Sequence, residues 1–322
     1  MNYSRLSVIM PNFNHGHFLE ETIEAILSQS LQPIEIIIID DASTDDSVEI
    51  IQKYIKSNKN ICLFENKNNM GAIYNTIKYL HRIRGEYFYV MGADDKVLPG
   101  LFEKSVDFLR KYPHAGYCCS DSILEYIDEP GYYKKNNTNL SDEPCYIDAK
   151  RFERLLKTRN PRFTGQSVVY NKTIFINSVS FLPELRWEND LFALYVLGLR
   201  YGLCYIPKTM SIVRVSSKTQ YAGQAARQPK IRREVLSHII DLIESPKYMD
   251  VSDSFRRSGI LCRNNTEILY VLSKKKKLFK YLNYVLIKRA LFHLLRDLIV
   301  LNTPKRVKHL YHKRMTIKPD MN

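Results

Sequence analysis

Two neighbouring carboxylates, Asp94 and Asp95, follow an apolar and aromatic run in the stretch YFYVMGADDKVLPG, residues 87–100. Burying an unpaired carboxylate is costly, so one interpretation places both in a solvated turn before Pro99 and Gly100. The other interpretation gives them a cation. Mg²⁺ and Mn²⁺ prefer oxygen ligands and usually keep several waters, so one or two protein carboxylates suffice. These residues alone leave both interpretations open.

Two further polar groups come directly after apolar runs, at residues 11–14 (PNFN) and 40–46 (DDASTDD). A carboxylate at Asp40 or Asp41 can accept hydrogen bonds from a base N–H or from ribose hydroxyls. Alternatively, the second group caps a helix, with Ser43 or Asp45 accepting from open N–H groups. Both can hold, because capping by Asp45 leaves Asp40 and Asp41 available.

The segments that must position these groups alternate between strand and helix patterns. Strand patterns occupy residues 7–10, 34–40, 61–64 and 86–91, and helix patterns occupy 17–28, 46–56 and 71–83. The continuous apolar run at 34–40 is typical of a strand covered on both faces. The alternation predicts an α/β fold, a mostly parallel, Rossmann-like sheet flanked by helices. Ligands bind such sheets at the carboxyl ends of the strands, so the three polar groups should converge on one crevice.

The next hundred residues give a less regular pattern. They predict a helix at 102–111, a strand at 115–124, a polar loop at 131–144, a strand at 164–170, a buried helix at 187–202 with acidic residues at its entrance, and two short strands at 203–207 and 210–215. A loop as long as 131–144 in a compact domain is often functional.

The charge of the chain is concentrated in its last hundred residues. Residues 222–322 hold 22 Lys and Arg against 8 Asp and Glu, so the whole formal excess of +14 lies there. Such a basic region would meet an acidic surface, phospholipid or nucleic acid. Charged residues interrupt the apolar stretch 274–301, so no span of 18 uncharged residues remains for a transmembrane helix. An amphipathic helix lying on a membrane, or packed on the body, fits better.

The N-terminus and the cysteines indicate a compartment. The first 25 residues carry several charges where a signal peptide needs an apolar stretch. The six cysteines show no C-x-x-C spacing and no density typical of a disulfide scaffold. Reduced thiols in the cytoplasm are therefore expected.

The series SVIMPNFN, EIIIIDDASTDDS and GEYFYVMGADD, in this order and spacing, resembles the family 2 inverting glycosyltransferases with the GT-A fold. The resemblance is close over residues 6–100, loose over 101–220, and leaves the basic region unmatched. It implies a nucleotide-sugar-binding half at 1–105 and an acceptor-binding half at 106–221. A basic, helical C-terminal region at 222–322, suited to association with a membrane, follows them.

The same resemblance implies a donor site. Asp94 and Asp95 fall in the family's D-x-D motif for a divalent cation, Mn²⁺ or Mg²⁺, and for the ribose and phosphate. Gly92 stands where that motif has its first acidic residue. Asp41, beside Asp40, would hold the base, with Pro11 and Phe13 packed near it. A UDP-sugar is favoured, because uracil has the imide N–H that such a carboxylate accepts from.

An inverting transfer also needs a base that removes the acceptor's hydroxyl proton. In the family it comes from an acidic motif, commonly E-D, at the start of a helix about a hundred residues after the metal motif. The stretch WENDLFALYVLGLRYG matches, with Asp190 at the base position and Glu188 as the reserve candidate. Capping of the helix by Asn189 or Asp190 is the alternative. In the closing segment Arg214 is expected to neutralise diphosphate charge, and Ser216 replaces a histidine of the family.

These features favour one enzymatic function. It is transfer of a sugar from a nucleotide diphosphate to a hydroxyl of a glycan or lipid-linked acceptor, in cell-surface polysaccharide synthesis. The enzyme would be cytoplasmic and peripheral at the inner face of the cell membrane. The alternative, suggested by Gly92 and Ser216, is a catalytically impaired protein that binds sugar nucleotides or nucleic acid; otherwise nucleic acid is not an expected partner. A phosphorylation-controlled receiver module also has paired acids after a strand, but the long second half fits it poorly.

Overall fold

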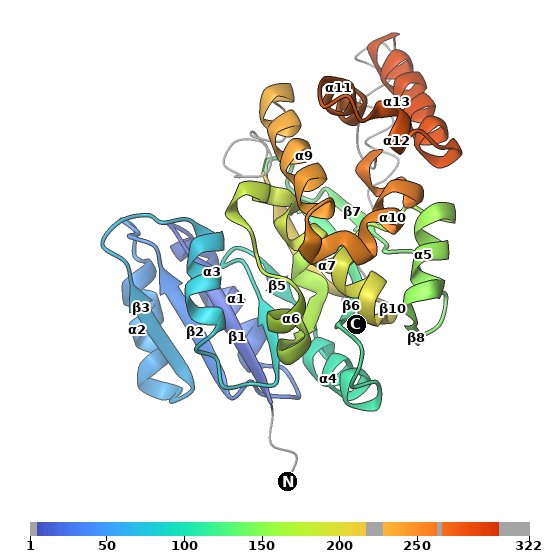
Figure 1. The fold of residues 1–322 in the computed structure, drawn as a ribbon. Helices are drawn as coiled ribbons and strands as arrows, with labels where there is room; N and C mark the ends of the chain where they lie inside the picture. Colours follow the sequence, from blue (N-terminus) through green and yellow to red (C-terminus); the bar gives the residue numbers. More distant parts are fainter. Residues whose placement is uncertain (1–4, 217–227, 263–265, 303–322) are drawn as a thin grey trace.

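The structure of the protein, a computed structural model, describes residues 5–216, 228–262 and 266–302 (Figure 1). Its described strands form one sheet in the order β3-β2-β1-β4-β9-β6-β10-β5, with β7 paired to β6 and β8 paired to β10. Helices cover both faces of the sheet, and the C-terminal helices gather beside its second half, far from β1–β3 (Figure 1).

The first half of the sheet is parallel, as the sequence predicts. Its elements are β1 (Leu6–Asn12), α1 (Gly16–Leu27), β2 (Glu35–Asp40), α2 (Ser47–Ser57), β3 (Ile61–Glu65), α3 (Ala72–Leu80) and β4 (Tyr87–Val90). Along β2, Ile36 and Ile38 belong to the core shared with α1 and α2, and Ile37 and Ile39 belong to the core on the other face. This strand is therefore covered on both faces, which explains its unbroken apolar sequence.

The second half of the sheet is mixed. Its elements are β5 (Lys96–Val97), α4 (Leu101–Lys111), β6 (Tyr117–Tyr126), β7 (Tyr133–Asn136), β8 (Cys145–Ile147), α5 (Ala149–Thr158), η1 (Gly165–Ser167), β9 (Val168–Asn171), α6 (Lys172–Ser178), η2 (Pro183–Glu188), α7 (Asn189–Tyr201) and β10 (Leu203–Val215). Strand β9 lies between β4 and β6 and is antiparallel to both, whereas β6 and β10 are parallel.

Two segments differ from the sequence-based expectations. The polar stretch 131–144 contains strand β7, which pairs with β6 through its backbone and so needs no apolar pattern. The two short strands expected at 203–207 and 210–215 are one strand, β10, whose register with β6 shifts at Thr209. Pro207 has no N–H to donate to the ladder, and such irregularities accommodate proline.

The basic C-terminal region is helical, as expected. It contains α9 (Pro229–Ile243), η3 (Pro246–Tyr248), α10 (Met249–Ser258), η4 (Ile260–Cys262), α11 (Glu267–Lys274), α12 (Leu278–Tyr281) and α13 (Tyr284–Asn302). Phe255 of α10 packs against Phe192 and Tyr195 of α7, with ring centroids 5.7 and 6.2 Å apart, so this region shares the core of the body. Among the described residues no helix is long and apolar enough to cross a membrane. Residues 217–227, 263–265 and 303–322 of the basic region and its approach lie outside the described residues.

Candidate active site

The carboxyl ends of β1, β2 and β4 lie at one edge of the sheet, because β1 pairs in parallel with both of its neighbours. Side chains tie the first two loops together. Asn12 donates through Nδ2 to Asp40 Oδ1 at 2.8 Å, and the Asn14 N–H donates to Ser43 Oγ at 3.0 Å. Asn14 and Ala42 adopt left-handed backbone conformations, with φ of 56° and 65°. Such strained conformations at non-glycine residues cluster at functional sites.

Asp41 is buried and organises the segment that leads into α3. Its Oδ1 accepts from Asn66 Nδ2 at 2.8 Å and from the Met70 N–H at 2.9 Å, and its Oδ2 accepts from the Gly71 N–H at 2.7 Å. Burial alone would raise the pKa of Asp41, but these hydrogen bonds and one from Asn75 lower it below the ordinary value. The carboxylate is thus held ionised at the edge of the sheet where the base of a donor is expected.

Replacing Asp41 by asparagine is expected to lower the free energy of unfolding at pH 7 by about 2 kcal/mol, since charge-assisted hydrogen bonds are lost and an amide NH₂ faces N–H donors. The folded-state pKa lies below the ordinary 3.8, so the stabilisation is present above pH 3.8 and disappears as the pH falls through the folded-state value. Urea unfolding of both proteins from pH 7 to pH 3 measures this. A difference that stays constant down to pH 3 would contradict it.

The carboxylates of Asp94 and Asp95 converge over Gly92. A Cβ built on Gly92 would lie 2.7 Å from Asp94 Oδ1 and 2.9 Å from Asp95 Oδ2, which is closer than real Cβ contacts. The glycine that replaces the first acidic residue of the motif therefore leaves room for both oxygens. Two carboxylate oxygens facing one space suit a hard divalent cation, so the donor set fits Mg²⁺ or Mn²⁺. In the described part of the chain no group of three or more His, Cys, Asp or Glu could hold a metal ion.

The two carboxylates have different surroundings. Asp95 is only 3% exposed, and burial together with the charge of Asp94 raises its pKa well above the ordinary value. The Asp94 side chain is 24% exposed, and His15 Nε2 lies 4.0 Å from its Oδ2. Asp94 is therefore the more accessible of the two carboxylates.

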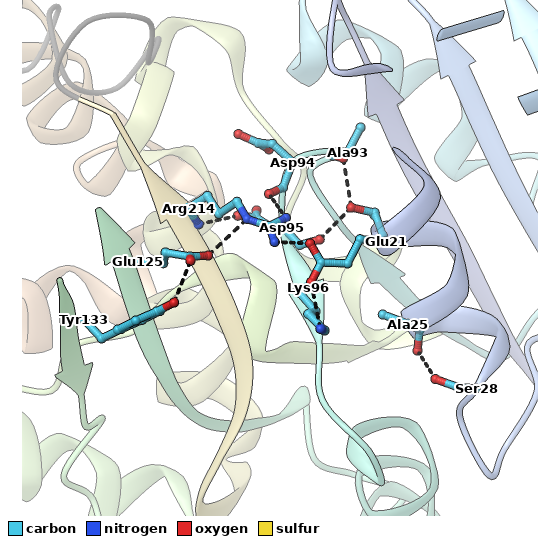
Figure 2. A network of polar contacts seen from close by, with 11 residues as sticks. Glu21, Ala25, Ser28, Ala93, Asp94, Asp95, Lys96, Glu125, Tyr133 and Arg214 are labelled. Carbon is cyan, nitrogen blue, oxygen red and sulfur yellow. Dashed lines mark hydrogen bonds and ion pairs between the residues drawn. The ribbon is translucent and has the colours of Figure 1, made fainter. Parts of the chain in front are cut away.

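Arg214 of β10 contacts both residues of this acidic loop (Figure 2). Its N–H donates to Asp95 Oδ1 at 2.9 Å, and its Nη1 donates to the carbonyl oxygen of Asp94 at 3.0 Å. The guanidinium also donates through Nε to Glu125 at 3.1 Å and pairs through Nη2 with Glu21. All three guanidinium nitrogens thus have acceptors within the protein, although the sequence led us to expect that Arg214 neutralises a diphosphate.

Helix α1 supports the same loop from the other side. Glu21 bridges Arg214 and Lys96, with 2.7 Å to Lys96 Nζ (Figure 2). The Thr22 hydroxyl lies 3.0 and 2.9 Å from the carbonyl oxygens of Ala93 and Asp95. Burial alone would raise the pKa of Glu21, but the hydrogen bond from Lys96 and the charge of Arg214 lower it. We call Glu21, Glu125 and Arg214 the arginine clamp. Sequence reasoning missed both glutamates, because they lie 193 and 89 residues from Arg214 along the chain.

Asp190 reaches this region through η1. A Cβ on Gly165 would lie 2.6 Å from Asp190 Oδ2, so the carboxylate occupies the space above that glycine. The next residue, Gln166, donates a side-chain hydrogen bond to Asp95. One turn of 3-10 helix therefore separates Asp190 from the acidic loop. The other oxygen of Asp190 accepts from the Leu191 N–H at 2.8 Å, so Asp190 also satisfies a donor in the first turn of α7.

The two residues that precede Asp190, Glu188 and Asn189, lie in different elements. Asn189 is buried, and its amide oxygen accepts from the Leu182 N–H, which lies outside α7. Glu188 is the last residue of η2. The structure thus brings Asp94, Asp95 and Arg214 into contact, places Asp190 one turn away, and places Asp40, Asp41 and the half-exposed Phe13 at the same edge of the sheet, with Pro11 inside β1.

Solved structures share this fold. S. aureus TarS 1-349 in complex with UDP-GlcNAc superposes with a TM-score of 0.60 at 17% identity and covers 79% of this chain and 72% of its own. The mannosyltransferase PcManGT from Pyrobaculum calidifontis, in complex with GDP-Man and Mn²⁺, superposes with a TM-score of 0.54 at 14% identity. The superposition covers 98% of this chain and 86% of PcManGT. These likenesses confirm the expected GT-A fold.

Curated relatives match mainly the first half of the chain. An uncharacterized glycosyltransferase of Haemophilus influenzae is 37% identical over 125 residues, and the putative teichuronic acid biosynthesis glycosyltransferase TuaG of Bacillus subtilis is 36% identical over 106 residues. These stretches are 38% and 33% of this chain, which spans about half the length of the relatives, 50% and 42%. The sequence model of the family described as "Glycosyl transferase family 2" matches residues 7–178 of this chain. With a match over more than half of its length, the chain belongs to glycosyl transferase family 2.

Proposed function

We propose that the protein is an inverting glycosyltransferase that moves a sugar from a nucleotide diphosphate, with a UDP-sugar favoured, to a hydroxyl of a glycan or lipid-linked acceptor. The observation that carries the proposal is the arrangement around Gly92 and η1. Two carboxylates converge over Gly92, and a third, Asp190, lies one turn of 3-10 helix away. The complexes of TarS with UDP-GlcNAc and of PcManGT with GDP-Man and Mn²⁺ support a nucleotide-sugar donor and a cation.

Asp94 and Asp95 are the residues that would hold the cation, with Asp94 as the accessible ligand. When bound, a divalent cation stabilises the negative charge that grows on the diphosphate leaving group. A nearby cation would also favour ionised Asp95, whose pKa is raised by burial. The arginine clamp holds the Asp94 carbonyl oxygen for this role, and the main-chain N–H of Arg214 holds the Asp95 carboxylate.

The remaining expected residues have separate tasks in the proposal. Asp41, with Asp40 beside it, accepts from the base or the ribose, and Phe13 and Pro11 pack near the base. Asp190 accepts the proton of the acceptor hydroxyl as that oxygen attacks the sugar from the face opposite the leaving group. Glu188 is the reserve candidate for this base.

We place the enzyme at the cytoplasmic face of the cell membrane, in the synthesis of a surface polysaccharide. The similarity to a putative teichuronic acid biosynthesis enzyme supports the pathway class. The excess of 22 cationic over 8 acidic residues in 222–322 supports a location beside anionic lipid.

A second candidate function is binding of a sugar nucleotide without turnover. Gly92 favours it, because the motif has lost one of its acidic residues. Both candidate functions use the same donor site. They differ in turnover, because only the glycosyltransferase transfers the sugar and needs Asp190 as a base.

A panel of nucleotide sugars, each with and without Mn²⁺, tests the donor site by thermal unfolding. The matching donor at a hundred times its dissociation constant is expected to stabilise the protein by about 2.7 kcal/mol, and omission of Mn²⁺ should remove most of that gain. Asp94→Asn should abolish the dependence on Mn²⁺. Asp107→Asn, which changes an exposed carboxylate on α4, is the matched control and should respond as the wild type does. The absence of stabilisation by any donor in the presence of Mn²⁺ would contradict the proposed function.

A further inference from the structure

Helix α13 carries an exposed apolar stripe. The stripe consists of Tyr284, Ile287, Leu291, Leu294 and Leu295, whose exposed fractions range from 42% to 75%. Steps of three and four residues place these side chains on one side of the helix. Phe292 lies beside the stripe and is also exposed.

The opposite side of α13 is fastened to the body. Leu286, Ala290 and His293 are buried, and His293 Nε2 lies 3.0 Å from the Cys262 carbonyl oxygen. Arg289 donates to the carbonyl oxygens of Leu156 and Arg159 at 2.7 and 2.8 Å. The helix is therefore held in one orientation, at the outer edge of the C-terminal helices (Figure 1). Its stripe lies on the side opposite these contacts.

A helix that is apolar on two sides is normally covered on both. A contiguous exposed apolar patch marks a contact with a protein or a membrane. The charges of the C-terminal region decide which of the two we expect. Lys274, Lys276 and Lys288 are exposed, and the sequence after the helix, residues 303–322, adds six Lys and Arg against one Asp. A second copy of the chain would bring the same cations against one another, whereas anionic lipid complements them.

We propose that α13 is the element that docks this protein on an anionic membrane. The helix lies in the plane of the interface, with its stripe at the level of the acyl chains and Lys288 of the same helix at the headgroup phosphates. This inference deepens the membrane placement of the proposed function by naming the surface and the lipid class. It concerns binding alone, so it can be tested without a donor or an acceptor.

The test is co-sedimentation of the full-length protein with vesicles of phosphatidylcholine, with and without phosphatidylserine. The wild type is expected to bind the phosphatidylserine vesicles and to be released by high salt, because the lysine contribution is screened. The double variant Ile287→Glu/Leu291→Glu should bind at least about 100-fold more weakly, since two apolar side chains no longer leave water. Met249→Glu changes a side chain that is equally exposed, on α10 outside the stripe, and should bind as the wild type does.

Circular dichroism and the melting temperature confirm that the variants fold, which is expected because the changed side chains are exposed. Unchanged vesicle binding by the double variant would overturn the proposal. A loss of dimers or larger species by the double variant, with vesicle binding intact, would also overturn it and assign the stripe to a contact between copies. If vesicle binding depends on the stripe but no nucleotide sugar stabilises the protein, the membrane inference stands and the proposed function fails. If a nucleotide sugar stabilises the protein but vesicle binding does not depend on the stripe, the proposed function stands and the membrane inference fails.

Discussion

Replacing Asp190 by asparagine is expected to lower kcat with the preferred donor by about 10²–10⁴-fold, because an amide cannot accept the proton of the attacking hydroxyl. The affinity for the donor should change little, since Asp190 lies beside Gly165 and not among the residues proposed to hold the cation or the base. Steady-state kinetics with the donor found in the thermal panel give kcat, and thermal stabilisation by the same donor gives its affinity.

Two further variants make this prediction specific to Asp190. Gly165→Ala keeps Asp190 but adds a Cβ only 2.6 Å from Asp190 Oδ2. This variant should therefore displace the carboxylate and lower kcat as well. Glu188→Gln removes the neighbouring acid and should leave kcat within about tenfold of the wild type. If Glu188→Gln causes the large loss and Asp190→Asn does not, the base is Glu188. If all three variants turn over as the wild type does, neither acid is the base.

The positions of Asp41, Asp94 and Asp95 could be predicted because local pattern decides them. Each follows an apolar strand, and parallel pairing of β1 with β2 and β4 brings the ends of those strands to one edge. Strand β2 was predictable in the same way, since an unbroken isoleucine run needs cover on both faces. These features depend only on the order of residues within a few turns of chain.

The arginine clamp could not be predicted, because it depends on the order of strands across the sheet. Arg214 reaches Glu125 because β10 pairs with β6, and it reaches Glu21 because α1 lies beside the loop that follows β4. No pattern within the sequence connects residues so far apart. The insertion of antiparallel β9 between β4 and β6 is equally non-local. For the same reason, the sequence showed that Gly92 replaces an acid but not that its missing side chain makes room for two carboxylates.

Replacing Arg214 by methionine is expected to lower the free energy of unfolding by about 3 kcal/mol, since it removes a buried guanidinium and leaves Glu21 and Glu125 without their cation. We expect the lower end of the usual range because the Glu21 side chain is 45% exposed. Chemical unfolding measures this loss. Arg214→Lys should restore part of the stability, because it keeps the charge, but one ammonium cannot replace three nitrogens that donate in different directions. Mn²⁺-dependent donor binding should therefore stay at least about tenfold weaker in Arg214→Lys, a difference of about 1.4 kcal/mol.

Glu21→Gln decides whether Arg214 acts on the loop or directly on the donor. If Arg214 contacts the diphosphate, removing the charge of Glu21 frees the guanidinium for it and should strengthen donor binding. If Arg214 instead holds the backbone of Asp94, the same change loosens the clamp and should weaken Mn²⁺-dependent binding about tenfold. The matched control is Glu103→Gln, which changes a glutamate on α4 that accepts a hydrogen bond from the Ser30 hydroxyl and does not contact the clamp. It should alter neither stability nor donor binding. Tighter donor binding by Glu21→Gln would show that the guanidinium serves the diphosphate, and the role of the clamp in placing the acidic loop would then be wrong.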